Sequence, residues 1–254
     1  MATVLSIANQ KGGVGKTTTA VNLSAALSTV NKRVLLVDID PQGNATMGCG
    51  VDKYTLDHSV CELLLDECTL DQAIIASEDA LIDLIGANTD LVAAEVALLK
   101  NPGGEAKLKN LIDQRRNNYD YIIIDCPPSL NMLTINAFTA SDSIIIPMQC
   151  EYYALEGLSS LIETINKIQS TSNPELEICG IIRTMHDTRN NLSNEVSVQL
   201  SQHFSHKVFK TIIPRNVKLA EAPSFGVSAI EYARSSKGAI AYVALASEII
   251  RRTQ

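Results

Sequence analysis

The stretch that decides the fold is KGGVGKTTT, residues 11–19, which follows the apolar run VLSIAN at residues 4–9. Gly12, Gly13 and Gly15 allow positive φ angles and close backbone approach, so successive N–H groups can point inward at phosphate oxygens. The helical pattern that begins inside the stretch adds the partial positive charge of a helix N-terminus. A strand, a glycine-rich loop and a helix in this order predict a phosphate-binding loop, and with it a fold of the P-loop NTPase type.

Two lysines flank the glycines of this loop, although a phosphate site needs only one. Lys16 is expected to lie on the β- and γ-phosphates of a nucleotide, and the Thr17 hydroxyl on Mg²⁺. Gln10 stands where the usual pattern GxxxxGK[ST] has its first glycine, and Lys11 has no role in that pattern. The residues of the loop that are expected to bind nucleotide are Lys11, Gly12, Gly13, Val14, Gly15, Lys16, Thr17 and Thr18.

Carboxylates follow two further apolar runs. Asp125 ends YIIID (121–125), and because an unpaired acid in a buried strand is costly, a Mg²⁺-bound water or Thr17 is its expected partner. Asp40 lies past the end of another run, in a loop that could order around a γ-phosphate and place the attacking water. A turn or helix cap explains Asp40 equally well, and Asp38 could be structural. The candidate metal ligands are Thr17, Asp40 and Asp125.

Apolar runs and helix-period segments alternate along the chain. Continuous runs, typical of strands covered on both faces, stand at 4–9, 33–38, 121–125, 143–148 and 178–184. Helix-period segments stand at 16–29, 58–66, 91–99, 105–116, 131–140, 155–170, 192–204 and 237–251. We therefore expect an α/β fold, a mostly parallel twisted sheet flanked by helices on both faces, with ligands beyond the carboxyl ends of its strands. No repeat or linker divides the chain, which predicts a single domain over residues 1–254.

The composition indicates a globular protein, its cellular location and the state of its cysteines. The 254 residues are 46% hydrophobic and 19% charged, which suits a sizeable buried core. Apolar stretches are too short for a membrane span, and the chain begins in a strand pattern with no cleavable signal, so a cytoplasmic location is expected. The six cysteines are scattered without a CxxC pair, which favours reduced thiols over disulfides or zinc.

The sequence resembles the ParA/Soj chromosome-partitioning ATPases of the deviant Walker A class. The resemblance rests on KGGVGKTTT with its additional Lys11, VLLVDIDPQGNAT, YIIIDCPPSL, PMQCEYYALEGL and IIPRNVKLAEAPSFG. It implies a Mg²⁺-dependent ATPase with slow intrinsic turnover that forms a homodimer with ATP and binds double-stranded DNA. It further implies a nucleoid-associated protein that acts with a ParB/Spo0J-like partner in chromosome or plasmid partitioning, with no membrane role.

The resemblance also implies roles for single residues. Lys11 would reach across a nucleotide-sandwich dimer to the partner's phosphates, where a cation delivered in trans stabilises the transition state as an arginine finger does. Asp40 would position the hydrolytic water, and Asp125 is the acid of the Walker B strand. The candidate catalytic residues are Lys11, Lys16 and Asp40, the residues beside the adenine are Pro214, Arg215 and Asn216, and the dimer-interface residues are Lys11, Gly12 and Glu151.

Two of these residues have simpler explanations in the sequence itself. Pro214 fixes a rigid turn after a strand, and turn formation alone accounts for it. Glu151 follows another strand end, where it could pair with a partner's lysine or cap the helix that follows. Both explanations stay open at the level of the sequence.

The net charge of −7 is unevenly distributed. Residues 1–180 hold 11 lysines and arginines against 23 acids, whereas residues 181–254 hold 10 against 5. Several basic residues in loop-like stretches suggest a surface patch, and the resemblance implies that DNA binds there. Without a recognition helix or an aromatic platform, contacts should go to phosphates and ignore base sequence. The candidates are Arg189, Arg215, Lys218, Arg234 and Lys237.

Three other functions use similar motifs. A MinD-like membrane-associated regulator needs a C-terminal amphipathic membrane helix, whereas residues 237–251 suit a helix packed on the core. An iron–sulfur protein resembling the nitrogenase iron protein needs thiolates arranged for a cluster shared across a dimer. The scattered cysteines show no such motif, although Cys126 beside the Walker B acid is near the site and keeps this alternative open. A P-loop metabolic kinase or synthetase would turn over faster on a small substrate.

Overall fold

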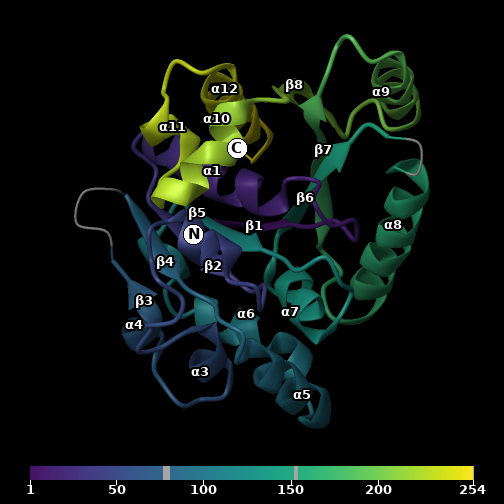
Figure 1. Cartoon of the computed structure of the whole chain (residues 1–254). Helices are drawn as coiled ribbons and strands as arrows, with labels where there is room; N and C mark the ends of the chain where they lie inside the picture. Colours follow the sequence, from purple (N-terminus) through teal and green to yellow (C-terminus); the bar gives the residue numbers. More distant parts are fainter. Residues whose placement is uncertain (77–80, 152–153, 254) are drawn as a thin grey trace.

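A single eight-stranded sheet forms the centre of the molecule (Figure 1). The computed structural model describes residues 1–76, 81–151 and 154–253. The strands are β1 (Thr3–Ile7), β2 (Val34–Asp38), β3 (Ile74–Ile75), β4 (Ile82–Ile85), β5 (Tyr121–Asp125), β6 (Ser143–Gln149), β7 (Glu177–His186) and β8 (Val208–Pro214). Their spatial order is β3-β4-β2-β5-β1-β6-β7-β8, and every neighbouring pair is parallel except β3 and β4.

Helices cover both faces of the sheet, which confirms the predicted α/β fold (Figure 1). One face carries α1 (Lys16–Ser28), α10 (Val217–Glu221), α11 (Ala229–Tyr232) and α12 (Lys237–Thr253). The other carries α3 (Val60–Leu64), α5 (Leu91–Lys100), α6 (Lys107–Ile112), α7 (Met132–Ala140) and α8 (Ala154–Thr171). The remaining helices are α2 (Asn44–Gly48), α4 (Leu70–Ala73) and α9 (Asn191–His203), with 3₁₀ turns η1 (Gly104–Ala106), η2 (Arg116–Asn118) and η3 (Ala222–Phe225).

The central strands are buried along their whole length, as continuous apolar runs predict. Every residue of β2 and β5 is buried, and so are four of the five residues of β1. Two hydrophobic clusters, one on each face, enclose these strands. The loops that leave the carboxyl ends of the strands therefore start from a rigid base, which is where such folds place their ligands.

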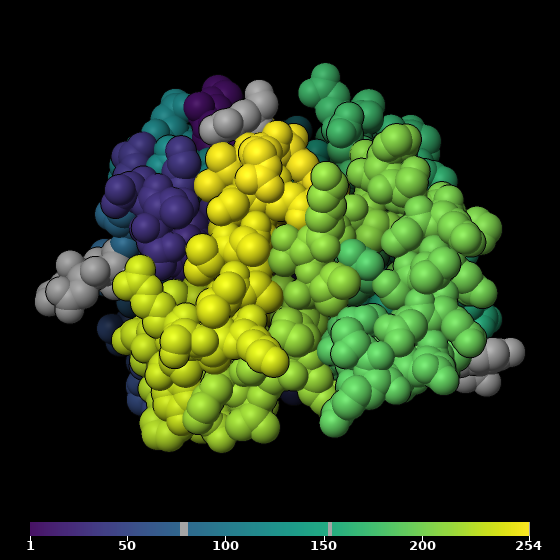
Figure 2. All heavy atoms as spheres, turned by 90° about the horizontal axis from the view of Figure 1, so that it is seen from above, coloured from purple at the N-terminus to yellow at the C-terminus, as the bar shows by residue number. Residues whose placement is uncertain are grey.

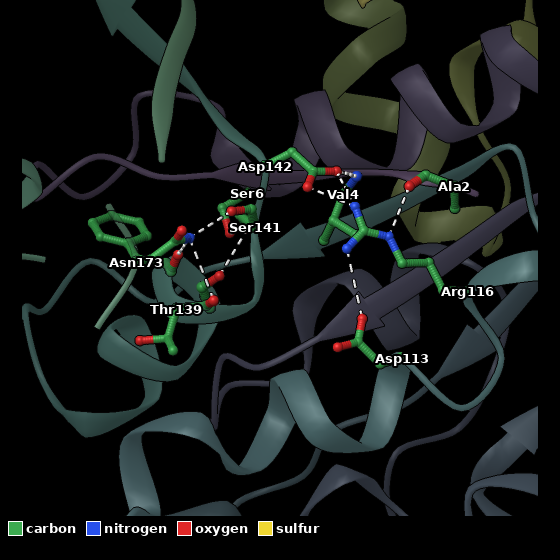
Figure 3. A network of polar contacts seen from close by, with 11 residues as sticks. Ala2, Val4, Ser6, Asp113, Arg116, Thr139, Ser141, Asp142 and Asn173 are labelled. Atoms are coloured by element: carbon green, nitrogen blue, oxygen red, sulfur yellow. Dashed lines mark hydrogen bonds and ion pairs between the residues drawn. The ribbon is translucent and has the colours of Figure 1, made fainter. Parts of the chain in front are cut away.

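A polar network fixes the opposite, amino end of β1 (Figure 3). The Asp142 carboxylate accepts the Val4 N–H at 2.8 Å and pairs with Arg116, whose Nε donates to the Ala2 carbonyl at 3.0 Å. Deeper in the same region the Ser6 and Ser141 hydroxyls lie 2.6 Å apart. The network ties β1 to the start of β6, and so holds the strand that leads into the phosphate loop.

The last helix, α12, packs on the core as predicted. The Tyr242 hydroxyl lies 3.1 Å from that of Thr19 in α1. The Glu248 carboxylate accepts the backbone N–H groups of Lys210 and Thr211 at 2.9 and 3.0 Å, and it pairs with Arg252. In the described ranges, no helix combines the length and apolarity that crossing a bilayer requires.

The sequence patterns miss the short elements. Strand β3 has only two residues, and β4 and β8 are interrupted by polar side chains, namely Asp83, Lys210 and Thr211. Helices α2, α4, α10 and α11 have four or five residues each, too few for a helical period to show. The predicted helix 58–66 corresponds to α3, which starts after its cap Ser59 and ends at Leu64, shortly before Asp66 with its φ of +61°. The predicted helix 105–116 contains α6 between 3₁₀ turns. The single domain over 1–254 stays a prediction.

Candidate nucleotide site

The phosphate loop follows β1 directly and ends at α1. Gly13 and Gly15 adopt φ angles of +72° and +90°, which glycine permits and other residues resist. Gly12 does not use a positive φ, and a Cβ built on it would meet no atom within 4 Å. Gly12 is thus bare toward solvent, so nothing within this chain requires glycine there.

Lys16 is the first residue of α1 and its side chain is buried, with 7% of the residue exposed. Burial lowers its pKa, and the nearby Asp125, Cys126 and Asp40 act in the opposite direction. Its Nζ donates to the Lys11 carbonyl at 3.2 Å. A buried ammonium whose only hydrogen bond among the described residues is a long one to a neutral carbonyl favours binding of an anion. The binding of phosphates by Lys16 stays a prediction.

Asp125 is the clearest sign of a cation site. It is fully buried at the end of β5, in register with Asp38 of β2, and within the described chain neither carboxylate oxygen has a hydrogen bond of regular geometry. Burial, and then the neighbouring Asp38, raise its pKa well above the usual range, and the Thr17 hydroxyl opposes this. An unpaired buried carboxylate is destabilising, and a bound cation removes that cost.

Mg²⁺ fits these donors. In the described ranges no three His, Cys, Asp or Glu side chains form a metal cluster of their own. Mg²⁺ is commonly held by one or two carboxylates together with phosphate oxygens and waters, so Asp125 and the Thr17 hydroxyl suffice on the protein side. The site therefore suits a metal that arrives with a nucleotide.

Asp38 and Asp40 differ in role. The fully buried Asp38 accepts the Thr46 N–H at 2.9 Å, the Thr46 hydroxyl at 2.8 Å and the Asp40 N–H at 3.1 Å. Burial raises its pKa. Asp38 therefore has a structural role, which the sequence alone had left open. Asp40 accepts the Gln42 N–H at 2.9 Å, so it does stabilise a turn, and it also lines the hollow described next.

A hollow of about 730 Å³ lies at the carboxyl ends of the strands, in the size range of small-ligand sites. Most of the predicted nucleotide-binding residues line it. They are Gly12, Gly13, Gly15, Lys16, Thr17, Thr18, Pro214, Arg215 and Asn216. The remaining two do not line it: Val14 of the loop is buried, and Lys11 points toward Glu151. Asp40, predicted to be catalytic, lines the hollow as well.

Lys11 pairs with Glu151 of the same chain. Its backbone N–H is held by the Asn9 side chain at 3.0 Å, and Asn9 in turn donates to the Pro147 carbonyl of β6 at 2.7 Å. The ammonium of Lys11 is thus drawn toward β6 and away from the hollow of its own chain. The sequence left open whether Glu151 pairs or caps; here it pairs, and within one chain.

Two residues of β7 belong to the site although the motifs do not identify them. The Thr184 hydroxyl donates to the buried Val14 carbonyl at 2.7 Å, which braces the phosphate loop from behind. Met185 lines the hollow with a φ of +48°, rare for a residue with a side chain. The predicted strand 178–184 ends beside them, so the rule that ligands bind beyond strand ends was the available signal.

Thr184→Val should weaken ATP binding several-fold. Valine has nearly the same shape but no hydroxyl, so the Val14 carbonyl would lose its donor in a buried position, a change that costs about 1–3 kcal/mol. Isothermal titration with MgATP measures the effect, and Thr184→Ser, which keeps the donor, is the matched control. Equal affinities in the valine variant and the wild type would show that this bond does not position the loop.

The five basic candidates separate into groups. Arg189, Arg215 and Lys237 line one hollow of about 700 Å³ at the ends of β7 and β8. Lys218 lies on α10 rather than in a loop, paired with Glu221 at 2.8 Å, and Arg234 lines a different hollow behind α1. In the view from above, residues of the basic C-terminal third occupy much of the surface (Figure 2).

Comparisons with known proteins agree with this geometry. A family model described as an AAA domain matches residues 2–178. Sporulation initiation inhibitor protein Soj of Bacillus subtilis (strain 168) is 51% identical over 249 residues, which cover 98% of each chain. Chromosome partitioning protein ParA of Caulobacter vibrioides (strain NA1000 / CB15N) is 45% identical over 251 residues, 98% of this chain and 94% of that protein.

A solved structure extends the likeness to three dimensions. The crystal structure of cobyrinic acid a,c-diamide synthase from Mycobacterium smegmatis with bound ADP and magnesium has a TM-score of 0.87 and 38% identity. The match covers 100% of this chain and 96% of that one. Fold and site thus define a P-loop ATPase. The near full-length relatives place it more narrowly, since the chain belongs to the ParA/Soj family of chromosome-partitioning ATPases.

Proposed function

We propose that this protein is an ATP-dependent dimerising ATPase that binds DNA without sequence preference as its ATP-bound dimer. The observation that carries the proposal is that the two lysines of the phosphate loop point in different directions. Lys16 serves the hollow of its own chain, whereas Lys11 points away from that hollow and Gly12 beside it is bare. A second copy that approached this edge would meet an exposed cation and a loop with no side chain in the way.

Hydrolysis is assigned to three side chains. Lys16 binds the β- and γ-phosphates, and Lys11 supplies a second cation to the nucleotide of the partner subunit, where negative charge spreads in the transition state. Asp40 lies at the hollow, where it would orient the attacking water. Mg²⁺, held by Thr17 and Asp125, would neutralise phosphate charge when it is bound with ATP.

DNA binding is assigned to the basic C-terminal third. Arg189, Arg215 and Lys237 share one hollow and would contact phosphates, with Lys218 and Arg234 outside it. Each neutralised phosphate contributes about 0.9 to the salt dependence, so doubling the patch in a dimer turns weak contact into useful affinity. A ParB/Spo0J-like partner would stimulate turnover, and the protein would act at the nucleoid in the cytoplasm.

Paired variants test this proposal. Asp40→Ala should accumulate an ATP-bound dimer because it leaves the phosphate contacts of Lys16 intact, whereas Gly12→Val should bind ATP and stay monomeric. The valine meets nothing within its own chain, so a loss of dimer would come from the approach of the second copy. Light scattering and gel filtration with ATP, ADP and no nucleotide measure both. An ordinary ATP-dependent dimer in Gly12→Val would remove the sandwich arrangement.

One other function has specific support, since the Mycobacterium smegmatis structure is that of cobyrinic acid a,c-diamide synthase. The segregated basic surface favours DNA instead. A synthase or kinase would turn over quickly on a small substrate and ignore DNA. Slow ATP hydrolysis that DNA and a ParB-like protein stimulate jointly would distinguish partitioning from metabolism.

A further inference from the structure

The loop that carries Asp40 is held mainly from inside the molecule. Asp38 bonds the Asp40 N–H, and Thr46 joins Asp38 to the Ala87 N–H at 2.9 Å. These contacts fix the two ends of the segment 41–43 through buried groups. The Gly43 N–H also donates to the Asp40 carbonyl at 2.8 Å, which closes the turn. Gln42, in the middle, is exposed, and its carbonyl is bonded from outside the segment.

Lys53 makes this bond from a neighbouring loop. Its Nζ donates to the Gln42 carbonyl at 2.5 Å. Its aliphatic stem packs on Gly43, because a Cβ built there would lie 2.8 Å from the Lys53 Cδ and 2.5 Å from the Ala87 carbonyl oxygen. Gly43 itself adopts a φ of +60°. Gly43 is thus enclosed between Ala87 and Lys53, with no room for a side chain.

We propose that Lys53 is a positioning residue for ATP hydrolysis, which fixes the segment 41–43 and thereby the carboxylate of Asp40. The inference rests on the proposed role of Asp40 as the water-orienting group. Asp40 bonds the N–H of Gln42, and Lys53 bonds the carbonyl of the same residue. The N–H and the carbonyl of Gln42 are therefore both hydrogen-bonded, the first to the Asp40 carboxylate and the second to the Lys53 ammonium.

The geometry predicts an effect on the chemical step and not on binding. Lys53 does not line the nucleotide hollow, whereas Lys16 and the glycines of the phosphate loop do. A hydrogen bond from a charged donor is about twice as strong as a neutral one, so its loss allows the peptide at Gln42 to shift while the ends of the segment stay in place. A small displacement of a group that orients a reactant lowers the rate strongly while ground-state contacts persist.

Lys53→Met tests the inference, because methionine keeps much of the stem over Gly43 and removes the donor. Single-turnover hydrolysis should slow about tenfold, while the Kd for MgATP and the melting temperature stay near those of the wild type. Lys53→Arg, which keeps a charged donor, should restore most of the rate. Lys100→Met, at an exposed lysine ending α5, is the matched control and should behave as the wild type.

Two outcomes would overturn the inference. The first is a Lys53→Met rate within about twofold of the wild type. The second is a loss of rate that is matched by weaker ATP binding or that Lys53→Arg fails to restore. Asp40→Ala, measured beside these variants, separates this inference from the proposed function. If Asp40→Ala hydrolyses ATP normally, the role of Asp40 is wrong; if it is inactive and Lys53→Met is normal, only the role of Lys53 is wrong.

Discussion

Lys16→Ala is expected to abolish ATP binding, with a loss of affinity of about a hundredfold or more. The loop N–H groups alone cannot balance the phosphate charge in a partly dehydrated hollow. Removing Lys16 also leaves Asp125 and Asp40 without their nearby cation. Isothermal titration with MgATP measures the loss directly.

The matched control is Lys32→Ala, which removes a half-buried lysine from the turn after α1 and leaves the hollow untouched. Thermal unfolding of both variants checks that each is folded. Unchanged MgATP affinity in Lys16→Ala would mean that the loop is not the phosphate site, and the whole assignment built on it would be wrong.

Arg189→Glu is expected to remove most ATP-dependent DNA binding while the dimer still forms. A dimer loses two phosphate contacts, so the slope of log K against log salt should fall by about 2, and affinity near 0.1 M salt by on the order of fiftyfold. The Arg189 side chain is 88% exposed and pairs with Asp187 at 2.8 Å. The charge reversal therefore brings three negative charges together, namely the new glutamate, Asp187 and the DNA phosphate. Fluorescence anisotropy with a duplex of arbitrary sequence, across a salt series, measures both quantities.

Lys218→Glu tests the second group of basic residues in the same way. Arg251→Glu, at the end of α12 far from Lys237, is the control with the same change of charge. Wild-type DNA affinity in the dimer of one reversal variant would exclude that residue from the surface. Wild-type affinity in both would place the DNA surface elsewhere.

The sequence identified the parts of the site that are contiguous in the chain. Gly13 and Gly15 stand in the loop after β1, and Lys16 and Thr17 begin α1 directly after that loop, so pattern and structure agree. Asp125 was predictable as well, because an acid that ends a fully apolar strand must be buried.

Contacts between distant segments were not predictable in this way. The bond from Thr184 to Val14 joins residues 170 positions apart, and nothing in either local pattern points to the other. The pair of Lys11 and Glu151 required the relative position of β1 and β6. Arg234 looked like its basic neighbours in the sequence, yet the fold places it at another hollow.

The position of β1 in the sheet has a consequence for synthesis on the ribosome. The strand leads into the phosphate loop and is made long before its two neighbours, β5 and β6, whose residues run from 121 to 149. At about 5–20 residues per second, roughly 7–30 seconds pass before both neighbours have been made. The Tyr242 contact to α1 comes later still. The nucleotide loop is therefore translated well before the segments that surround it, and the apolar strand β1 has no partner strand until β5 and β6 have been made.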